Sequence, residues 1–188
     1  MSEENLLLLS CCAPCSCGVI QKLAGQKRRF TVLFYNPNID CLEEYEKRLR
    51  ENQRVCERFG VPFVTLPYEP DVWRTATKGL EKEPERGKRC SVCFEMRLCR
   101  AAQYAKENGF HAFSSVLGVS RYKDLAQVNE AAARAEAASG VPYDRTNWRK
   151  GGNESLRHEL IKEMSLYNQR YCGCVFSRAQ RDEYEKNT

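Results

Sequence analysis

The sequence has 188 residues and a net charge of +5, and 42% of its residues are hydrophobic. These values predict one domain, residues 1–188, with a sizeable core and a mildly basic surface that is compatible with a polyanionic partner. No apolar run reaches the roughly 18 residues of a transmembrane helix, and the N-terminus lacks the features of a signal peptide, so we expect a cytoplasmic protein without membrane contact.

The first part of the chain alternates apolar strands with helices. A buried strand over residues 5–10 precedes a helix that begins near Pro14 and ends at Gly25, because proline favours the first helical turn and glycine favours the end. Residues 30–36 are β-branched and aromatic, which predicts the second strand. A helix over residues 40–60 follows.

The rest of the chain continues this alternation. In chain order we expect a strand over residues 61–67, a short helix over 71–80, a polar loop over 81–89, a long helix over 91–108, a strand over 111–117, a helix over 123–139, a strand over 141–146, a helix over 154–167 and a short polar helix after 177. The pattern predicts an α/β fold, in which a parallel sheet of about five strands is flanked by helices on both faces.

The 11 cysteines are the most informative feature of the sequence. Because a reducing cytoplasm disfavours disulfides, they indicate metal binding or redox chemistry. Most of them form three groups, at the beginning, middle and end of the chain: Cys11, Cys12 and Cys15; Cys90 and Cys93; Cys172 and Cys174. The first group follows the first strand and opens a helix, whose dipole favours thiolates.

The three groups are expected to meet at one edge of the sheet. Ligands of open parallel sheets bind outside the carboxyl ends of the strands, where the loops converge. A structural zinc ion or a [4Fe–4S] cluster takes four ligands, so six or seven thiols indicate a cluster with a second metal or with redox thiols. We favour iron–sulfur chemistry over a zinc site or a simple dithiol. The spacing is not that of a bacterial ferredoxin, which disfavours a plain electron carrier.

The other cysteines are weaker candidates. Cys56 lies on the apolar face of a helix and is expected in the core. Cys99 should face away from the site, since it lies about half a turn round the helix from Cys90. The role of Cys17 stays open, and Cys41 is expected at the surface.

Six stretches of the sequence together resemble one family. They are SCCAPCS, FYNPNI, EEYEKRL, RCSVCFEMRL, FSSVLGVSRYKD and YCGCVFS, and they resemble the QueH family across nearly the whole chain. The resemblance implies a fold similar to the adenine nucleotide α-hydrolase-like (HUP) group. It implies an epoxyqueuosine reductase, which removes the epoxide oxygen of epoxyqueuosine at the tRNA wobble position to give queuosine. It also implies a [4Fe–4S] cluster beside a mononuclear metal, expected to be iron.

The resemblance also assigns ligands. The cysteines of the family motifs are Cys11, Cys12, Cys90, Cys93, Cys172 and Cys174. Cys15 stands where other members can have aspartate, so it is a candidate ligand of the lone metal. The segment from Ser120 to Asp124 departs from the usual motif by lacking its proline, although Lys123 remains.

Further residues are candidates for catalysis and for tRNA binding. Proton donors are expected among Tyr35, Tyr122 and Lys123. The substrate-binding candidates are Asn36, Asn38, Arg89, Arg149 and Lys150, with Lys88 and Trp148 nearby in the sequence. Arg97 and Arg100 are interpreted as surface pairs on a helix. The electron donor is unknown, and we expect a monomer.

Two alternatives remain open at this point. A sulfur transferase acting on tRNA would need an ATP-binding, glycine-rich loop after the first strand, where this sequence has cysteines. A zinc-stabilised RNA-binding module would have the thiols but no redox activity.

Overall fold

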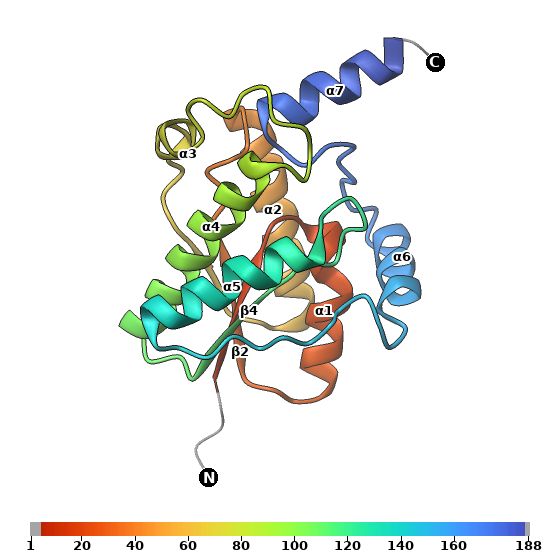
Figure 1. Cartoon of the computed structure of the whole chain (residues 1–188). Helices are drawn as coiled ribbons and strands as arrows, with labels where there is room; N and C mark the ends of the chain where they lie inside the picture. Colours follow the sequence, from red (N-terminus) through yellow and green to blue (C-terminus); the bar gives the residue numbers. More distant parts are fainter. Residues whose placement is uncertain (1–4, 187–188) are drawn as a thin grey trace.

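Four parallel strands form the centre of the molecule in the computed structural model, which describes residues 5–186 (Figure 1). The strand order is β3-β2-β1-β4. Leu7 in the central strand aligns with Thr31 on one side and with Phe113 on the other. The strands are β1 (Leu6–Ser10), β2 (Phe30–Phe34), β3 (Phe63–Thr65) and β4 (Ala112–Ser115).

Seven helices in the described part of the chain surround this sheet. Figure 1 shows α4 and α5 together on one face and α1 and α2 on the other. The helices are α1 (Ala13–Gly25), α2 (Leu42–Phe59), α3 (Pro70–Ala76), α4 (Lys88–Glu107), α5 (Leu125–Ser139), α6 (Asn153–Glu163) and α7 (Val175–Lys186). Within residues 5–186, none of these helices is long and apolar enough to cross a membrane.

Burial on both faces explains the composition of the core. Every residue of β1 is buried, as expected for a central parallel strand covered by helices on each side. Small side chains line the pair formed by α4 and α5, since Ala101 and Ala105 of α4 and Ala131 and Ala135 of α5 are fully buried. Small residues allow two helices to approach closely.

The prediction of a fifth strand over residues 141–146 is wrong. Only Tyr143 of this segment forms a bridge, with Phe113 of β4. Pro142 has no N–H to donate, and the Asp144 carboxylate accepts hydrogen bonds from the backbone N–H and the hydroxyl of Thr146. The side chain of Asp144 therefore turns the chain away before a strand can form.

The helix starts place the cysteines at the carboxyl edge of the sheet. Cys12 is the extended residue before α1, and Pro14 lies in the first turn of that helix. The α4 helix begins at Lys88, slightly earlier than expected, so Cys90 and Cys93 lie in its first two turns. Cys174 directly precedes α7.

Candidate metal centre

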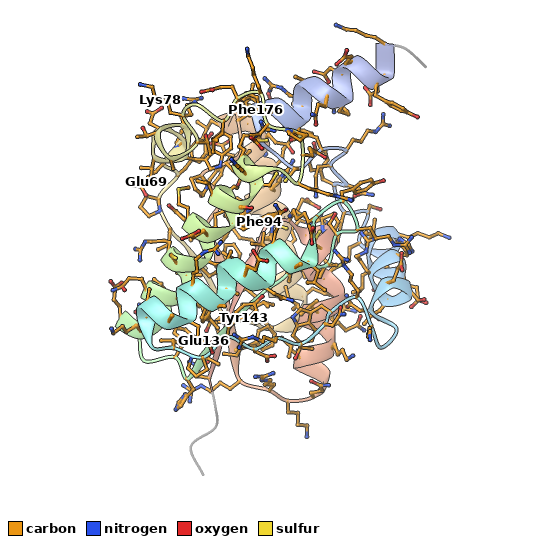
Figure 2. The ribbon with its side chains drawn as sticks, in the orientation of Figure 1. Glu69, Lys78, Phe94, Glu136, Tyr143 and Phe176 are labelled. Carbon is orange, nitrogen blue, oxygen red and sulfur yellow. The ribbon has the colours of Figure 1, made fainter. Side chains whose placement is uncertain are left out.

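One cavity of about 1060 Å³ opens at the carboxyl edge of the sheet. All seven thiols of the three sequence groups line it: Cys11, Cys12, Cys15, Cys90, Cys93, Cys172 and Cys174. Phe94, labelled in Figure 2, lies on the α4 wall of this cavity. The fold thus brings together sulfurs from the beginning, middle and end of the chain.

The N-terminal trio, Cys11, Cys12 and Cys15, is the tightest group of thiols. Its three sulfur atoms lie within 4.8 Å of one another, and those of Cys11 and Cys12 are 3.7 Å apart. The backbone at Cys12 is extended, with φ of −170°, which lets the side chains of Cys11 and Cys12 contribute to the same group of thiols. Cys15 adds the third sulfur from one helical turn further along α1. Three buried sulfurs at this spacing suit a soft metal ion.

The trio is arranged to hold one thiolate. Hydrogen bonds from Cys12 and Cys15 lower the pKa of Cys11, and the charges of Lys123 and Arg97 act in the same direction. The hydrogen bond to Cys11 raises the pKa of Cys12 to about 12, and Cys15 also has a raised pKa for this reason. Metal binding at the trio would therefore release protons from Cys12 and Cys15.

Two donors approach the trio from other segments. The Lys123 ammonium nitrogen lies 3.6 Å from the sulfur of Cys11. Burial acts to lower the pKa of Lys123, but the negative charge that Cys11, Cys172 and Cys15 carry when deprotonated raises it above its ordinary value. The side-chain N–H of Gln169 donates to the sulfur of Cys12 at 2.7 Å.

The central pair of thiols lies at the N-terminal end of α4. Cys90 accepts a hydrogen bond from the backbone N–H of Arg86 at 3.3 Å. Cys93 is buried, and its burial raises the pKa of the thiol to about 11, while Arg97 opposes the rise. The exposed N–H groups and dipole of a helix start favour thiolates, as metal ligation requires.

The C-terminal pair is held by the β2–α2 region. Gly173 has φ of +130°, a conformation that disfavours other residues. A Cβ atom there would lie 3.1 Å from the Arg48 guanidinium, which itself donates to the Cys172 carbonyl at 2.8 Å. The backbone N–H of Asp40 donates to the Gly173 carbonyl at 2.9 Å. Glycine at this position therefore lets the cysteine loop pack closely against α2.

The predicted catalytic residues occupy different environments. Lys123 and Tyr122 line the cavity, and Tyr122 is 80% exposed. Tyr35 is buried and does not line the cavity, and burial raises the pKa of its hydroxyl. The structure therefore separates Tyr35 from the other two residues.

The predicted substrate-binding residues are also divided. Asn38 and Arg89 line the cavity, whereas Asn36, Arg149 and Lys150 do not. Asn36 is buried and donates to the Ser10 carbonyl at 3.0 Å, while Lys150 is exposed on the surface.

The two arginines proposed as substrate contacts, Arg89 and Arg149, both donate hydrogen bonds to protein carbonyls. The Arg89 guanidinium donates to the carbonyls of Leu80, Glu81 and Glu83, and it lies 4.2 Å from the centre of the Phe176 ring. Arg149 donates to the carbonyls of Gly118, Ser120 and Lys123. These contacts give both arginines a role in fixing loops at the site. Trp148 is likewise buried, and its indole N–H donates a hydrogen bond to the hydroxyl of Ser114.

Three residues near the thiols were missed by the sequence reasoning. The interpretation of Arg97 as a surface residue is wrong, because its side chain is 1% exposed. Its position four residues after Cys93 and seven after Cys90 could have indicated the same helix face. Arg48 and Gln169 carried no comparable signal. Arg100 does form a surface ion pair, with Glu107.

The remaining cysteines lie outside the cavity wall. Cys56 is buried in the main hydrophobic core, as predicted. Cys17 is also buried there, while Cys41 and Cys99 are partly exposed. None of these four residues lines the cavity.

A comparison with solved structures supports the fold. The chain is similar to the U34-tRNA thiolase NcsA from Methanococcus maripaludis, described with its [4Fe–4S] cluster. The TM-score is 0.57 and the sequence identity is 13%, over 100% of this chain and 67% of that chain. This likeness confirms the predicted α/β fold with a parallel sheet flanked by helices, with four strands in place of about five.

Sequence comparison identifies the family. A family model described as epoxyqueuosine reductase QueH matches residues 6–180. The relative from Histophilus somni, named epoxyqueuosine reductase QueH, is 47% identical over 98% of this chain and 76% of its own length. The relative of the same name from Thermotoga maritima is 36% identical over 95% of this chain and 93% of its own length. The chain belongs to the QueH family.

Proposed function

We propose that this chain is an epoxyqueuosine reductase, which removes the epoxide oxygen of epoxyqueuosine at the wobble position of tRNA to give queuosine. The observation that carries the proposal is the gathering of seven thiols around one cavity in a member of the QueH family. Relatives that are up to 47% identical to this chain over the aligned residues carry that enzyme name. Modification of tRNA in this way is expected in the cytoplasm.

The donor set fits two metal groups. Cys11, Cys12 and Cys15 form one compact trio, which leaves four further thiols on the cavity wall: Cys90, Cys93, Cys172 and Cys174. Four thiolates are the usual ligand set of a [4Fe–4S] cluster. Three thiolates hold a single metal ion, expected to be iron, and leave a position open. We assign the four thiols to the cluster and the trio to the mononuclear metal.

Removal of the epoxide oxygen requires two electrons and two protons, and releases water with formation of an alkene. When bound, the cluster would supply electrons and the single metal would polarise the epoxide oxygen. The electron donor is a one-electron reductant that neither the sequence nor the comparisons identify. The chain itself must deliver protons and orient the base.

Lys123 is the strongest candidate for proton delivery. Its ammonium nitrogen is 3.6 Å from Cys11 and thus beside the trio. The carbonyl of Lys123 accepts a hydrogen bond from Arg149 at 2.8 Å, which fixes the loop that carries the ammonium group. Tyr122 lies at the exposed side of the cavity and is assigned to contact the RNA. Tyr35 stays a weaker candidate, because it does not line the cavity.

The cavity also suits a base taken out of the anticodon loop. Its volume of about 1060 Å³ is at the upper end of ordinary ligand pockets, which leaves room for a base beside the metal groups. Asn38 and Gln169 line it, and each has a buried side-chain oxygen without a hydrogen-bond partner in the described structure. These oxygens are suited to accept hydrogen bonds from the modified base.

A basic rim is consistent with an RNA partner. Basic residues outnumber the two acidic residues of the cavity wall, Glu85 and Glu185, of which Glu185 pairs with Arg170. The basic residues come from several segments: Arg48, Arg86, Arg89, Lys123, Arg157, Arg170 and Arg181. Positive charge at this position favours the phosphates on either side of the wobble nucleotide.

The two alternatives have less support. The turn between β1 and α1 is formed by Cys11 and Cys12 rather than by a glycine-rich loop, so it lacks the feature expected of an ATP-dependent sulfur transferase. A zinc-stabilised binding module does not account for the family of reductases to which the chain belongs.

An anaerobic assay with defined tRNA tests the proposed function. The iron-reconstituted protein, a chemical one-electron reductant and tRNA containing epoxyqueuosine should yield queuosine on nucleoside analysis by mass spectrometry. The matched control is the Cys11→Ser protein treated identically, which should leave epoxyqueuosine intact. Unchanged epoxyqueuosine with a fully iron-loaded parent protein would refute the assignment.

A further inference from the structure

Arg97 is a buried cation without an acidic partner. Its side chain is 1% exposed, and within residues 5–186 no carboxylate lies within the 4.0 Å limit of an ion pair. Arg48, also buried at the cavity, is instead paired with Glu44 at 2.6 Å. Burial of an uncompensated charge is strongly unfavourable, so the structure around Arg97 calls for another source of negative charge.

The hydrogen bonds of Arg97 fix its position without cancelling its charge. The guanidinium donates to the Tyr35 carbonyl and to the side-chain oxygen of Asn36. Asn36 in turn donates to the carbonyl of Ser10, the last residue of β1 and the neighbour of Cys11. Because both acceptors are neutral, they orient the guanidinium but leave its full charge at the end of the sheet.

The charge of Arg97 acts on two groups of thiols. On α4 it lies one turn beyond Cys93, which is itself one turn beyond Cys90. Its positive charge lowers the pKa of Cys11, where hydrogen bonds from neighbouring thiols are the larger cause. It also opposes the effect of burial on the pKa of Cys93. The geometry agrees: Arg97 lies on the face of α4 that carries Cys90 and Cys93, and its hydrogen-bonded partner Asn36 binds Ser10, the residue before Cys11.

We propose that Arg97 is a positioning residue whose charge balances the anionic sulfur centre of the cavity and raises the reduction potential of the iron held there. This inference rests on the proposed function for the presence of iron, but not for the identity of the substrate. A nearby positive charge stabilises the more negative, reduced form of a centre bound by thiolates. No carboxylate within residues 5–186 neutralises the charge of Arg97, and in this proposal the metal-bound thiolates do so.

Two substitutions separate charge from hydrogen bonding. Arg97→Lys keeps the positive charge and loses the planar fork, whereas Arg97→Gln keeps an N–H donor for Asn36 and loses the charge. Arg145→Gln is the matched control, because Arg145 pairs with Glu136 away from the cavity. Each iron-reconstituted protein is measured for iron content and titrated anaerobically against redox mediators, with visible absorption reporting the fraction reduced.

If the charge of Arg97 sets the reduction potential, the potential should change in Arg97→Gln and stay close to that of the parent protein in Arg97→Lys. At a fixed solution potential, Arg97→Gln should lower the ratio of reduced to oxidised centre by about tenfold, equivalent to about 59 mV for a one-electron couple. Arg97→Lys and Arg145→Gln should stay within about threefold of the parent protein. The reverse order, with glutamine preserving the potential and lysine lowering it, would show a hydrogen-bonding role and overturn the inference.

The remaining outcomes are also decisive. If circular dichroism shows that Arg97→Gln does not fold, Arg97→Lys decides alone, since an unchanged potential supports a charge role and a tenfold loss contradicts it. If the variants shift the potential as expected but the iron-loaded parent protein does not convert epoxyqueuosine, the proposed function is refuted and this inference stands. A parent protein that takes up no iron would refute both.

Discussion

The two edges of the sheet differ in whether their buried and half-buried cations have carboxylate partners. At the amino edge, Arg28 pairs with Asp144 at 2.8 Å and Arg145 pairs with Glu136. Figure 2 shows Glu136 and Tyr143 toward this lower edge and Phe176 at the opposite end, where it packs against the cluster of Trp73, Cys93 and Cys174. At the carboxyl edge, neither Arg97 nor Lys123 has a carboxylate partner within residues 5–186.

This difference separates what stabilises the fold from what the fold presents for chemistry. Pairs of opposite charge at the amino edge are complete within the protein, so they need no ligand. At the carboxyl edge Arg48 is paired with Glu44, but Lys123 faces the sulfur of Cys11 and Arg97 has no carboxylate partner in the described residues. The charge of those sulfurs depends on deprotonation and on bound metal. Groups with perturbed pKa values that gather in a cavity are typical of functional sites. Substitutions at the two edges should therefore have different consequences.

The largest effect is expected from loss of a thiol at the carboxyl edge. Cys11→Ser removes the sulfur with the lowered pKa, so iron bound per chain should fall and epoxyqueuosine reduction should drop by at least about 100-fold. The control is Cys99→Ser, since Cys99 is partly exposed and does not line the cavity. Equal activity of the two variants would remove Cys11 from the proposed site.

A smaller effect is expected at Gly173. Gly173→Ala forces a side chain into φ of +130° and places its Cβ 3.1 Å from Arg48, which should destabilise the loop by about 1–3 kcal/mol and weaken iron retention. Gly140→Ala is matched in having positive φ, +77°, but its Cβ would meet no atom within 4 Å. It should lower thermal stability without iron loss. Similar iron retention by both variants would contradict the close packing against Arg48.

The smallest effect is expected at the amino edge and depends on pH. Burial acts to raise the pKa of Asp144, but hydrogen bonds from Thr146 and the pair with Arg28 lower it below its ordinary value. A lowered folded-state pKa gives stability that is present above the unfolded-state pKa and disappears as the pH falls through the folded-state value. Arg28→Gln should therefore reduce the free energy of unfolding by about 0.5–1 kcal/mol at pH 7.

Denaturant unfolding at several pH values checks this prediction. The difference between Arg28→Gln and the parent protein should shrink below about pH 4, as Asp144 becomes protonated. Arg74→Gln, which removes an exposed surface pair with Asp71, should change little at any pH. Iron content should be unaffected in both variants. A difference for Arg28→Gln that grows on acidification would contradict the sign of the pKa shift.

The sequence predicted the parts of the structure that depend on local pattern. Apolar strands and periodic helices indicated the parallel sheet, and the rule for the carboxyl edge placed the three cysteine groups together. The prediction of a fifth strand was wrong because Pro142 and the turn at Asp144 override the β propensity of this segment. Cys56 was correctly placed in the core because helix periodicity alone decides its position.

Long side chains could not be placed from the sequence. Arg89, Arg97 and Arg149 each satisfy backbone carbonyls from segments that are distant in the sequence or folded into loops. Whether an arginine faces solvent or the interior depends on where those carbonyls lie after folding. Arg97 looked like a surface residue because its partner, Asn36, lies 61 positions earlier in the chain.

Iron positions in anaerobically grown crystals test the central claim most directly. Anomalous diffraction at the iron absorption edge should show two separate sites in the cavity: a cluster bound by Cys90, Cys93, Cys172 and Cys174, and a single iron bound by Cys11, Cys12 and Cys15. A single zinc ion as the cavity's whole metal content, or an iron-loaded protein with no iron at these sulfurs, would contradict the account.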